Sequence, residues 1–307
     1  MAIPTSRTKE KASITIDDAK CNGCGVCVTV CKDFSLEIKN GKATESSDAA
    51  FGCFACGHCM AVCPHGAITV TGRFLSPADI FELAPPKEAA SYDQLMALLN
   101  SRRSIREYKE KPVEKEITDK IIAAAQTAPM GLPPSDVNVL VLDTHEKNRV
   151  FADDFCRYVK KIKWLFSGLG LLLMRPFISK ASYEMFRDFV RPLVDAFSSQ
   201  TKEKADMVLY DAPLAMYFYG SPYTDPADPI IAATYAMQAA EALGLGTCMI
   251  GSVHPFIQNG GAAKQFRKKH GIKYKSREGL FVIFGYPAVK YHKGISRSFA
   301  SVTIYGN

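Results

Sequence analysis

Eight of the ten cysteines lie between residues 21 and 63 and follow one spacing twice. The two runs are Cys21-x-x-Cys24-x-x-Cys27-x-x-x-Cys31 and Cys53-x-x-Cys56-x-x-Cys59-x-x-x-Cys63-Pro64. Three thiolates spaced three residues apart can wrap one iron–sulfur cube, while the fourth thiolate of the run reaches a second cube. The repeated spacing therefore predicts two [4Fe–4S] clusters in one short, duplicated unit.

Two other uses of clustered cysteines fit this spacing less well. A pair of zinc sites needs four ligands each and usually takes two separated cysteine pairs, so the third cysteine of each run would be surplus. A disulfide lattice requires an oxidising compartment, but residues 1–8 lack the apolar core of a signal peptide. We therefore expect a cytoplasmic protein that carries iron–sulfur clusters.

The segment resembles the bacterial-type two-cluster ferredoxins. The implied ligands of one cluster are Cys21, Cys24, Cys27 and Cys63, and those of the other are Cys53, Cys56, Cys59 and Cys31. The first run departs from the family pattern at Lys32, where the second run has Pro64. His58 and His65 lie close by in the sequence, but all ligand positions are already filled, so we expect neither histidine to bind a cluster.

Turn and periodicity signals divide the chain into two parts. We expect a ferredoxin-like domain over 1–80, a linker over 81–91 that contains Pro85-Pro86, and a larger domain over 92–307. In the first domain we expect strands over 13–16 and 67–71 and a hairpin of 36–39 with 42–44 around Asn40-Gly41. In the larger domain the predicted helices are 92–100, 114–128 and 229–243, the last with Asp228 as its N-cap, and the predicted strands are 137–142, 214–219 and 280–284. Residues 151–208 form a mostly helical insertion, which we interpret as a lid or a dimer arm.

Composition and charge exclude several classes of protein. Hydrophobic residues make up 47% and charged residues 22%, as in globular proteins, and the net charge of +7 comes with no dense basic block. We therefore expect no nucleic-acid partner. The most apolar run, 164–174, is far shorter than the ~20 residues of a membrane span. We expect it to be buried core or channel lining; the alternative is a membrane-surface patch flanked by Lys161, Lys163 and Arg175.

A basic motif follows the first helix of the larger domain. It reads Ser101-Arg102-Arg103-Ser104-Ile105-Arg106-Glu107-Tyr108. Three guanidinium groups and a hydroxyl within five residues suit a phosphate and an attached polyol, although such a run alone is more often a solvated turn. The chain has no Gly-x-Gly-x-x-Gly fingerprint, so a Rossmann-type nicotinamide site is not expected.

This half of the chain resembles the nitroreductase superfamily of FMN enzymes. In that family Arg102, Arg103, Ser104 and Arg106 would hold the FMN phosphate, ribityl chain and ring edge. The segment 128–136 resembles the family stretch that reaches the flavin of the partner subunit, with Met130 and Pro133 replacing the usual Ser and Asn. The resemblance implies cofactor contacts there, through the backbone at least, from Pro129, Met130, Gly131, Pro133 and Ser135.

Two further segments extend the resemblance. Residues 239–251 match a helix-to-loop stretch beside the flavin, in which Met249, Ile250 and Gly251 would face the reactive edge of the ring. Beyond 284–287, Lys293 and Arg297 resemble the basic pair that completes the phosphate site. Cys156 and Cys248 lie outside the clusters, and we expect both to be small buried hydrophobic residues.

A ferredoxin joined ahead of a nitroreductase domain is a recognised subfamily, the ferredoxin-nitroreductases, and the chain resembles it. The resemblance implies an α+β fold, two [4Fe–4S] clusters, FMN and a homodimer. We expect an oxidoreductase that passes electrons through flavin to a nitroaromatic, quinone or similar conjugated acceptor, with no catalytic side chain. The alternatives are an enone reductase or reductive dehalogenase on the same flavin, and a non-catalytic electron-transfer module that serves a protein partner. The expected donor is reduced ferredoxin or another one-electron carrier rather than NAD(P)H.

Overall fold

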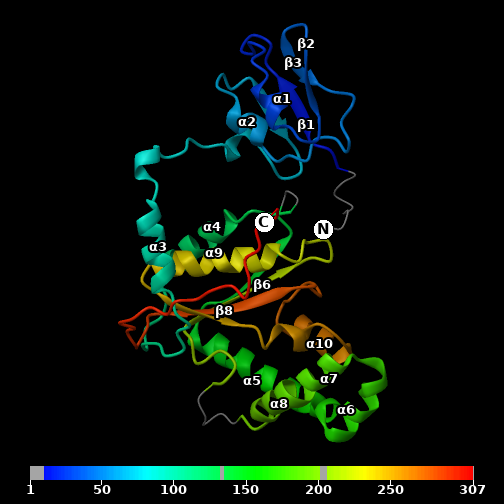
Figure 1. The fold of residues 1–307 in the computed structure, drawn as a ribbon, viewed down its shortest axis with the longest axis vertical. Coiled ribbons are helices and arrows are strands. Elements are labelled where there is room, and N and C mark those ends of the chain that lie inside the picture. Colours follow the sequence, from blue (N-terminus) through cyan, green and yellow to red (C-terminus); the bar gives the residue numbers. More distant parts are fainter. Residues whose placement is uncertain (1–9, 132–134, 201–205, 307) are drawn as a thin grey trace. The chain divides into compact units, whose positions relative to one another are not determined.

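A computed structural model describes residues 10–131, 135–200 and 206–306 (Figure 1). The chain divides into two compact units. The first unit comprises Met1–Ala89, Pro129–Val137 and Gly220–Asp228, and the second comprises Ala90–Ala128, Asn138–Tyr219 and Pro229–Asn307. The boundaries predicted at residues 80 and 92 stay predictions.

The first unit is built from two small antiparallel sheets and short helices. Its elements are β1 (Ser13–Ile16), α1 (Val26–Val30), β2 (Leu36–Lys39), β3 (Lys42–Glu45), α2 (His58–Val62), β4 (Ile68–Thr71), η2 (Pro77–Asp79) and η3 (Pro86–Glu88). Strand β1 pairs with β4, so that Ser13 lies opposite Thr71, and β2 pairs with β3 across the Asn40-Gly41 turn. Both turn residues have positive φ, 52° and 73°, as the expected hairpin turn requires. The four strands predicted for this part are confirmed.

The second unit is a four-stranded sheet covered by helices. Its elements are α3 (Tyr92–Ser101), α4 (Lys115–Gln126), β5 (Val137–Leu142), α5 (His145–Ile162), η4 (Lys163–Phe166), α6 (Gly168–Met174), η5 (Arg175–Phe177), α7 (Lys180–Met185), η6 (Phe186–Val190), α8 (Arg191–Ser198), β6 (Leu214–Gly220), α9 (Asp228–Ala242), β7 (Gly246–Ile250), η7 (His254–Ile257), α10 (Gly261–Lys269) and β8 (Gly279–Gly285). The strand order is β5-β6-β8-β7, and β8 is antiparallel to both of its neighbours. Helices α4 and α9 lie on one face of the sheet and α5 and α10 on the other (Figure 1). The predicted helices and strands are present. The end of the helix-to-loop stretch expected over 239–251 differs, because it forms the strand β7.

The central strands explain why this sheet is covered on both faces. Every residue of β6 and β8 is buried. The Tyr217 ring stacks on Phe281 at 4.3 Å between centroids and on Tyr219 at 5.0 Å. A strand with no exposed side chain needs an apolar layer on each side, which the helices supply.

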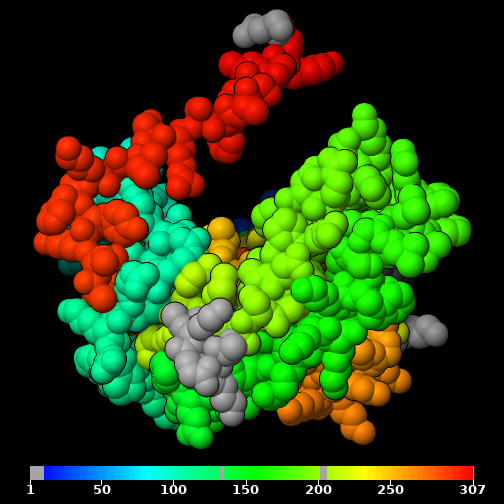
Figure 2. Space-filling view, turned by 90° about the horizontal axis from the view of Figure 1, so that it is seen from below, coloured from blue at the N-terminus to red at the C-terminus, as the bar shows by residue number. Residues whose placement is uncertain are grey.

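The insertion is helical, as predicted, but its apolar run is not buried. Helix α5 begins at His145, before the expected start at 151, and packs on α8 through Phe155 and Phe197, whose ring centroids are 5.5 Å apart. Leu171 is buried, whereas Trp164 and Leu173 are 66% and 64% exposed. The expectation of a buried core is wrong for Trp164 and Leu173, because α6 contacts only the short elements η4 and η5 extensively and buries only Gly170 and Leu171. Figure 2 shows this lobe, in green to light green, standing out beside the rest of the second unit.

Candidate functional site

Cysteines of both runs meet at one pocket in the first unit. Cys21, Cys24 and Cys27 line it together with Cys63 of the second run, as the crosswise ligand set requires. Two backbone amides point at its sulfur atoms: Ala43 N–H donates to Cys21 Sγ at 3.4 Å and Ala67 N–H to Cys63 Sγ at 3.3 Å. Hydrogen bonds of this kind favour the thiolate, and they raise the reduction potential of a bound cluster.

The remaining four cysteines form a second neighbourhood. Burial, together with the nearby thiols of Cys53, Cys56 and Cys31, raises the pKa of the Cys59 thiol to about 12. Burial also raises the pKa of Cys27, where the contributing thiols are those of Cys24 and Cys63. The thiols that act on Cys59 and those that act on Cys27 are therefore different. Together with the thiol on which it acts, each group combines cysteines of one run with the last cysteine of the other run.

Left-handed backbone positions shape both cysteine loops. Gly25 and Gly57 each precede a helix at φ 77°, and Gly23 and Ala55 hold equivalent places at φ 72° and 58°. A Cβ at Gly23 would lie 2.0 Å from the carbonyl oxygen of Gly41, so only glycine fits there. The loop can therefore turn its amides inward without a side chain in the way.

The two histidines near the cysteines, His58 and His65, do not form a common metal-binding site in the described residues. His65 lines the first pocket, and its Nε2 lies 2.9 Å from the Asn22 side-chain amide nitrogen, while His58 is exposed. Within the described ranges no group of three or more His, Cys, Asp or Glu side chains is arranged to hold a single metal ion. In a four-iron cube, by contrast, each thiolate binds an iron of its own.

In the second unit the basic motif lies along strand β7. Helix α3 begins with a capping box of Ser91 and Gln94 and ends at Ser101, just before the motif. Ser104 then forms a parallel bridge with Thr247, and Ile105 N–H donates to the Thr247 carbonyl at 2.9 Å. A side chain at Gly246 would collide with Ile105, so the glycine permits this close approach.

Three motif residues act together on Cys248, which β7 buries. Burial raises the pKa of its thiol, whereas Arg106, a hydrogen bond from Ser104, and Arg102 lower it. These side chains therefore gather at one point of the strand. Arg106 also lies 5.5 Å from the centre of the Tyr210 ring. The expectation that Cys248 is buried is confirmed.

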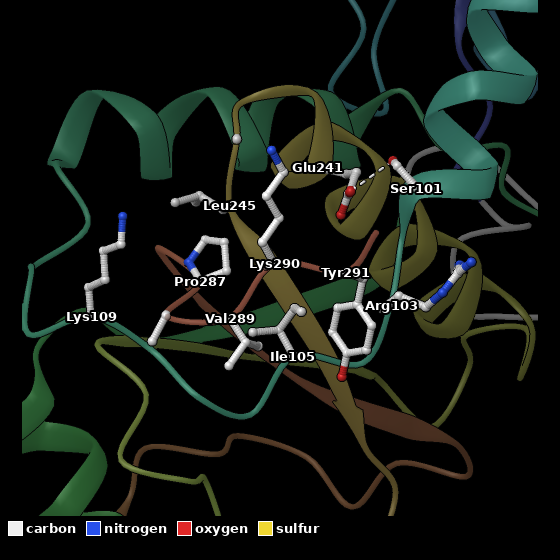
Figure 3. Close-up of a pocket in the computed structure, with 13 residues that line it drawn as sticks. Ser101, Arg103, Ile105, Lys109, Glu241, Leu245, Pro287, Val289, Lys290 and Tyr291 are labelled. Carbon is white, nitrogen blue, oxygen red and sulfur yellow. Dashed lines mark hydrogen bonds between the residues drawn. The ribbon is translucent and has the colours of Figure 1, made fainter. Parts of the chain in front are cut away.

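Arg103 takes part in a separate pocket of about 450 Å³ (Figure 3). Its Nη1 donates to the carbonyls of Asn100 and Arg102 at 2.9 and 2.7 Å, and its buried Nε has no partner among the described residues. Lys109, Lys290 and Tyr291 also line this pocket. The pocket thus presents three cations and an aromatic ring.

The same pocket also carries an acid. Ser101 Oγ donates to Glu241 Oε1 at 2.8 Å, as the dashed line in Figure 3 shows. Helix α9 holds Glu241 near its C-terminus and ends in a Schellman motif, in which Gly244 has φ 79° and Leu245 N–H donates to the Ala240 carbonyl at 2.9 Å. The chain reverses its direction at this motif and enters β7, which lies beside the basic motif.

The other predicted cofactor residues are placed unequally. Met249 is 51% exposed at the end of β7, next to buried Ile250 and exposed Gly251. Lys293 and Arg297 are exposed on the C-terminal segment, and a Cβ at Gly294 would lie 3.2 Å from an Arg103 nitrogen, which brings the segment beside the motif. Lys109, Lys290 and Tyr291 were not predicted, although the first stands three residues after Arg106 and the second three before Lys293.

The segment around 129–135 belongs to the first unit rather than to the one that holds the basic motif. Met130 and Ser135 are exposed, Pro129 is exposed beside them, and Gly131 N–H donates to Asp228 Oδ1 at 3.0 Å. Pro133 lies outside the described residues. Within the described part of one chain, no contact of this segment with a cofactor site is therefore assigned.

Comparisons with known proteins match each half separately. The model of the Nitroreductase family matches residues 99–286, and the model of the 4Fe-4S dicluster domain matches residues 20–68. Residues of this chain are 29% identical over 163 positions to an FMN reductase [NAD(P)H] of Bacillus subtilis, which covers 52% of this chain and 55% of the relative. They are 30% identical over 78 positions to NADH-quinone oxidoreductase subunit I 2 of Geobacter metallireducens. This match covers 23% of this chain and 60% of the relative. The chain thus spans little more than half the length of these relatives.

A solved structure shares the fold of the larger part. A nitroreductase from Bacteroides fragilis with bound FMN superposes with a TM-score of 0.50 at 17% identity, over 69% of this chain and 98% of that one.

In the described ranges, no helix has both the length and the apolar character to cross a bilayer.

Proposed function

The chain belongs to the nitroreductase family and has an N-terminal 4Fe-4S dicluster domain, and on this basis we propose that it is an FMN-dependent oxidoreductase fed by two [4Fe–4S] clusters. One observation carries the proposal. A single chain joins two separate sets of four cysteines to a basic motif that lies along β7. The relatives named above include a flavin reductase and an FMN-bound nitroreductase, which agrees with it.

The first unit has the donors that two clusters need. We assign one cluster to the set around the pocket and the other to the neighbourhood of Cys59. When bound, the clusters supply transfer of single electrons. The chain itself provides thiolates, amides that donate to sulfur, and left-handed turns that leave room for both.

Paired cysteine variants separate the crosswise ligand sets from local ones. The Cys24→Ser/Cys63→Ser variant removes two ligands of one assigned cluster, so the other cluster should remain and the bound iron should fall by about half. The matched Cys24→Ser/Cys31→Ser variant removes one ligand from each cluster and should impair both. Iron content and EPR spectra of anaerobically purified protein measure this. The reverse pattern would show that each run binds its own cluster.

The second unit has unsatisfied groups that a phosphate-bearing flavin would fit. The buried Nε of Arg103 and the buried hydroxyl of Thr247 have no partner within the described chain. We propose that Arg102, Arg103, Ser104 and Arg106, with Lys293 and Arg297, hold the phosphate, ribityl chain and ring edge, and that Met249, Ile250 and Gly251 face the reactive edge. When bound, FMN supplies both one- and two-electron chemistry. The guanidinium groups stabilise negative charge beside it.

We assign the remaining flavin contacts to a second copy of the chain. Pro129, Met130, Gly131, Pro133 and Ser135 would reach the cofactor of the partner in a cytoplasmic homodimer. The segment belongs to the first unit and the basic motif to the second. No side chain of this chain is given a catalytic role, because a flavin needs only orientation and charge from the protein.

Charge-removing variants test the flavin residues. Arg106→Gln and Arg102→Gln should each weaken FMN binding about tenfold or more, since a charge-assisted hydrogen bond is worth ~1.5–3 kcal/mol. Lys115→Gln, at an exposed lysine of α4, should leave FMN binding unchanged. Fluorescence titration of apoprotein with FMN gives the dissociation constants. Equal affinities in all three variants would place the flavin elsewhere.

The acceptor we propose is a nitroaromatic, a quinone or a similar electron-poor conjugated compound, and the donor is reduced ferredoxin or another one-electron carrier. Clusters would be redundant if NAD(P)H reduced the flavin directly, although the Bacillus subtilis relative is named for that coenzyme. Anaerobic mixing of holoprotein with NAD(P)H, and separately with reduced ferredoxin, distinguishes the donors by the flavin and cluster spectra. Rapid flavin bleaching by NADPH with the clusters left oxidised would overturn this assignment.

The same holoprotein, reduced and mixed with nitro, quinone, enone and halogenated acceptors, tests the reaction. Turnover of the nitro or quinone compounds alone supports the main proposal, whereas enone reduction or dehalogenation selects the specialised alternatives. Reoxidation only by a protein acceptor would make the chain an electron-transfer module.

A further inference from the structure

Seven large apolar side chains of the insertion are exposed between residues 164 and 189. Their exposed fractions range from 49% at Met185 to 86% at Phe177. We call this set the apolar ridge: Trp164, Leu169, Leu172, Leu173, Phe177, Met185 and Phe189. The elements that carry the ridge adjoin one another, since η4 contacts α6 and η6, and α7 contacts η6. Exposed apolar surface gathered in this way marks an interaction site in soluble proteins.

Basic residues are interspersed with the ridge residues along the sequence. Residues 160–191 contain seven Lys and Arg and two Asp and Glu, a net charge of +5 in a chain whose total is +7. Arg187 is paired with Asp188 and Lys163 with Asp195. Lys160, Lys161, Arg175 and Arg191 form no ion pair with an acid of the described chain, although Arg175 lies 5.7 Å from the Tyr183 ring centre.

We propose that the apolar ridge docks on the surface of an anionic lipid bilayer. Side chains of Trp, Leu and Phe enter the boundary between head groups and acyl chains, while neighbouring Lys and Arg side chains attract anionic head groups. Trp164 is the only tryptophan of the chain and is 66% exposed on the ridge, a residue type that favours this boundary. The inference goes beyond the proposed function and does not depend on the acceptor.

The charge favours a bilayer over a second copy that meets the ridge on a twofold axis. A twofold interface centred on the ridge would bring +5 against +5. Like charges placed together cost free energy, whereas an anionic surface neutralises them. The elements that carry the ridge, η4, α6, η5, α7 and η6, have 4, 7, 3, 6 and 5 residues, so they can lie along the surface but cannot cross the bilayer.

The experiment uses holoprotein and vesicles of phosphatidylcholine with or without phosphatidylglycerol. We expect cosedimentation with the anionic vesicles, weakened by salt, and a blue shift of the Trp164 fluorescence that brominated acyl chains quench. The Lys160→Gln/Lys161→Gln/Arg175→Gln variant should bind roughly a hundredfold more weakly, at about fivefold per charge. The Lys115→Gln/Lys120→Gln variant, which removes two exposed cations of α4, should bind as the parent does.

A second variant tests the apolar contribution. Leu169→Ser/Leu173→Ser changes two exposed residues, so flavin and iron contents should be unchanged while vesicle binding falls at least tenfold. Sedimentation velocity of the same variant gives its oligomeric state. Absence of vesicle binding in the parent overturns the proposal. A change from dimer to monomer in this variant, without vesicle binding in the parent, assigns the ridge to a second copy instead.

Discussion

The two units differ in what fills their interiors. The interior of the first unit is made largely of sulfur and small residues: Cys21, Cys27 and Cys59 are part of its buried cluster, with Ala12, Ala43 and Ala67. The second unit encloses aromatic side chains, among them Phe151, Phe155 and Phe281, beneath a sheet with two fully buried strands. The first unit therefore depends for its stability on what its cysteines bind, whereas the second holds a core of its own.

Removing iron gives the largest expected difference between the units. Binding free energy at a metal site is also folding free energy, so iron-depleted protein should lose the structure of the first unit. Amides of β1 and β4 should then exchange as in an unfolded chain, while amides of β6 and β8 stay protected; hydrogen exchange read by mass spectrometry measures both. Protection of β1 and β4 without iron would show that the packed thiols suffice.

A core truncation should make the opposite difference. Phe281→Ala deletes a fully buried ring that stacks on Tyr217, and it should destabilise the second unit by about 4 kcal/mol. Phe299→Ala, at a side chain that is 85% exposed, should change stability by less than ~0.5 kcal/mol. Urea unfolding followed by far-UV circular dichroism measures the loss. Cluster absorbance that disappears at the same lowered urea concentration would show that the units unfold as one.

A glycine exchange compares the two halves of the first unit. Gly23→Ala puts a methyl group against the Gly41 carbonyl at positive φ and should cost about 3 kcal/mol. Ala55→Gly at the equivalent place should change stability by less than ~0.5 kcal/mol, because relief of left-handed strain offsets the added freedom of the unfolded chain. The urea midpoint for cluster bleaching under anaerobic conditions measures both. Equal midpoints would mean that the hairpin yields to the new side chain.

Acidification should have the smallest effect, and it concerns the second unit. Burial lowers the pKa of His254 from its ordinary 6.5, and its Nδ1 lies 2.8 Å from the Tyr217 hydroxyl. Below pH 6.5 the unfolded chain therefore binds a proton that the folded one refuses. The free energy of unfolding is highest above pH 6.5, and it decreases by on the order of 1 kcal/mol as the pH is lowered through 6.5.

Urea unfolding at pH 7.5 and 5.5 measures this dependence of the unfolding free energy on pH, which we call the pH slope. His254→Gln should flatten it in part, and the remainder comes from His270, whose pKa burial also lowers. An unchanged slope in the variant would assign the effect to other groups.

Much of the fold could be predicted from sequence because its signals are local. Asn40-Gly41 specifies a hairpin turn, and the apolar runs of β6 and β8 specify buried strands whatever surrounds them. Strand β7 could not be predicted this way, since it begins at Gly246, a residue type depleted in strands, and its extended form is specified by pairing with β8 and Ser104.

The candidate sites show the same limit. The spacing of the cysteines encodes their grouping, because the chain can wrap a cube only locally. The pocket around Arg103 could not be foreseen, because Lys109, Lys290 and Tyr291 reach it from segments almost two hundred residues apart. The exposure of Trp164 was missed for a related reason: an apolar run reads alike whether or not another element covers it.

The pairing of β1 with β4 closes the first part of the chain within seventy-one residues. All eight cysteines of the two runs have then been synthesised, while residues 72–307 are still to come. At ~5–20 residues per second, the ribosome needs about 10–50 seconds to reach residue 307. Iron–sulfur assembly thus has a time window of its own, in which the nascent chain can receive its clusters before the flavin-binding half has been made.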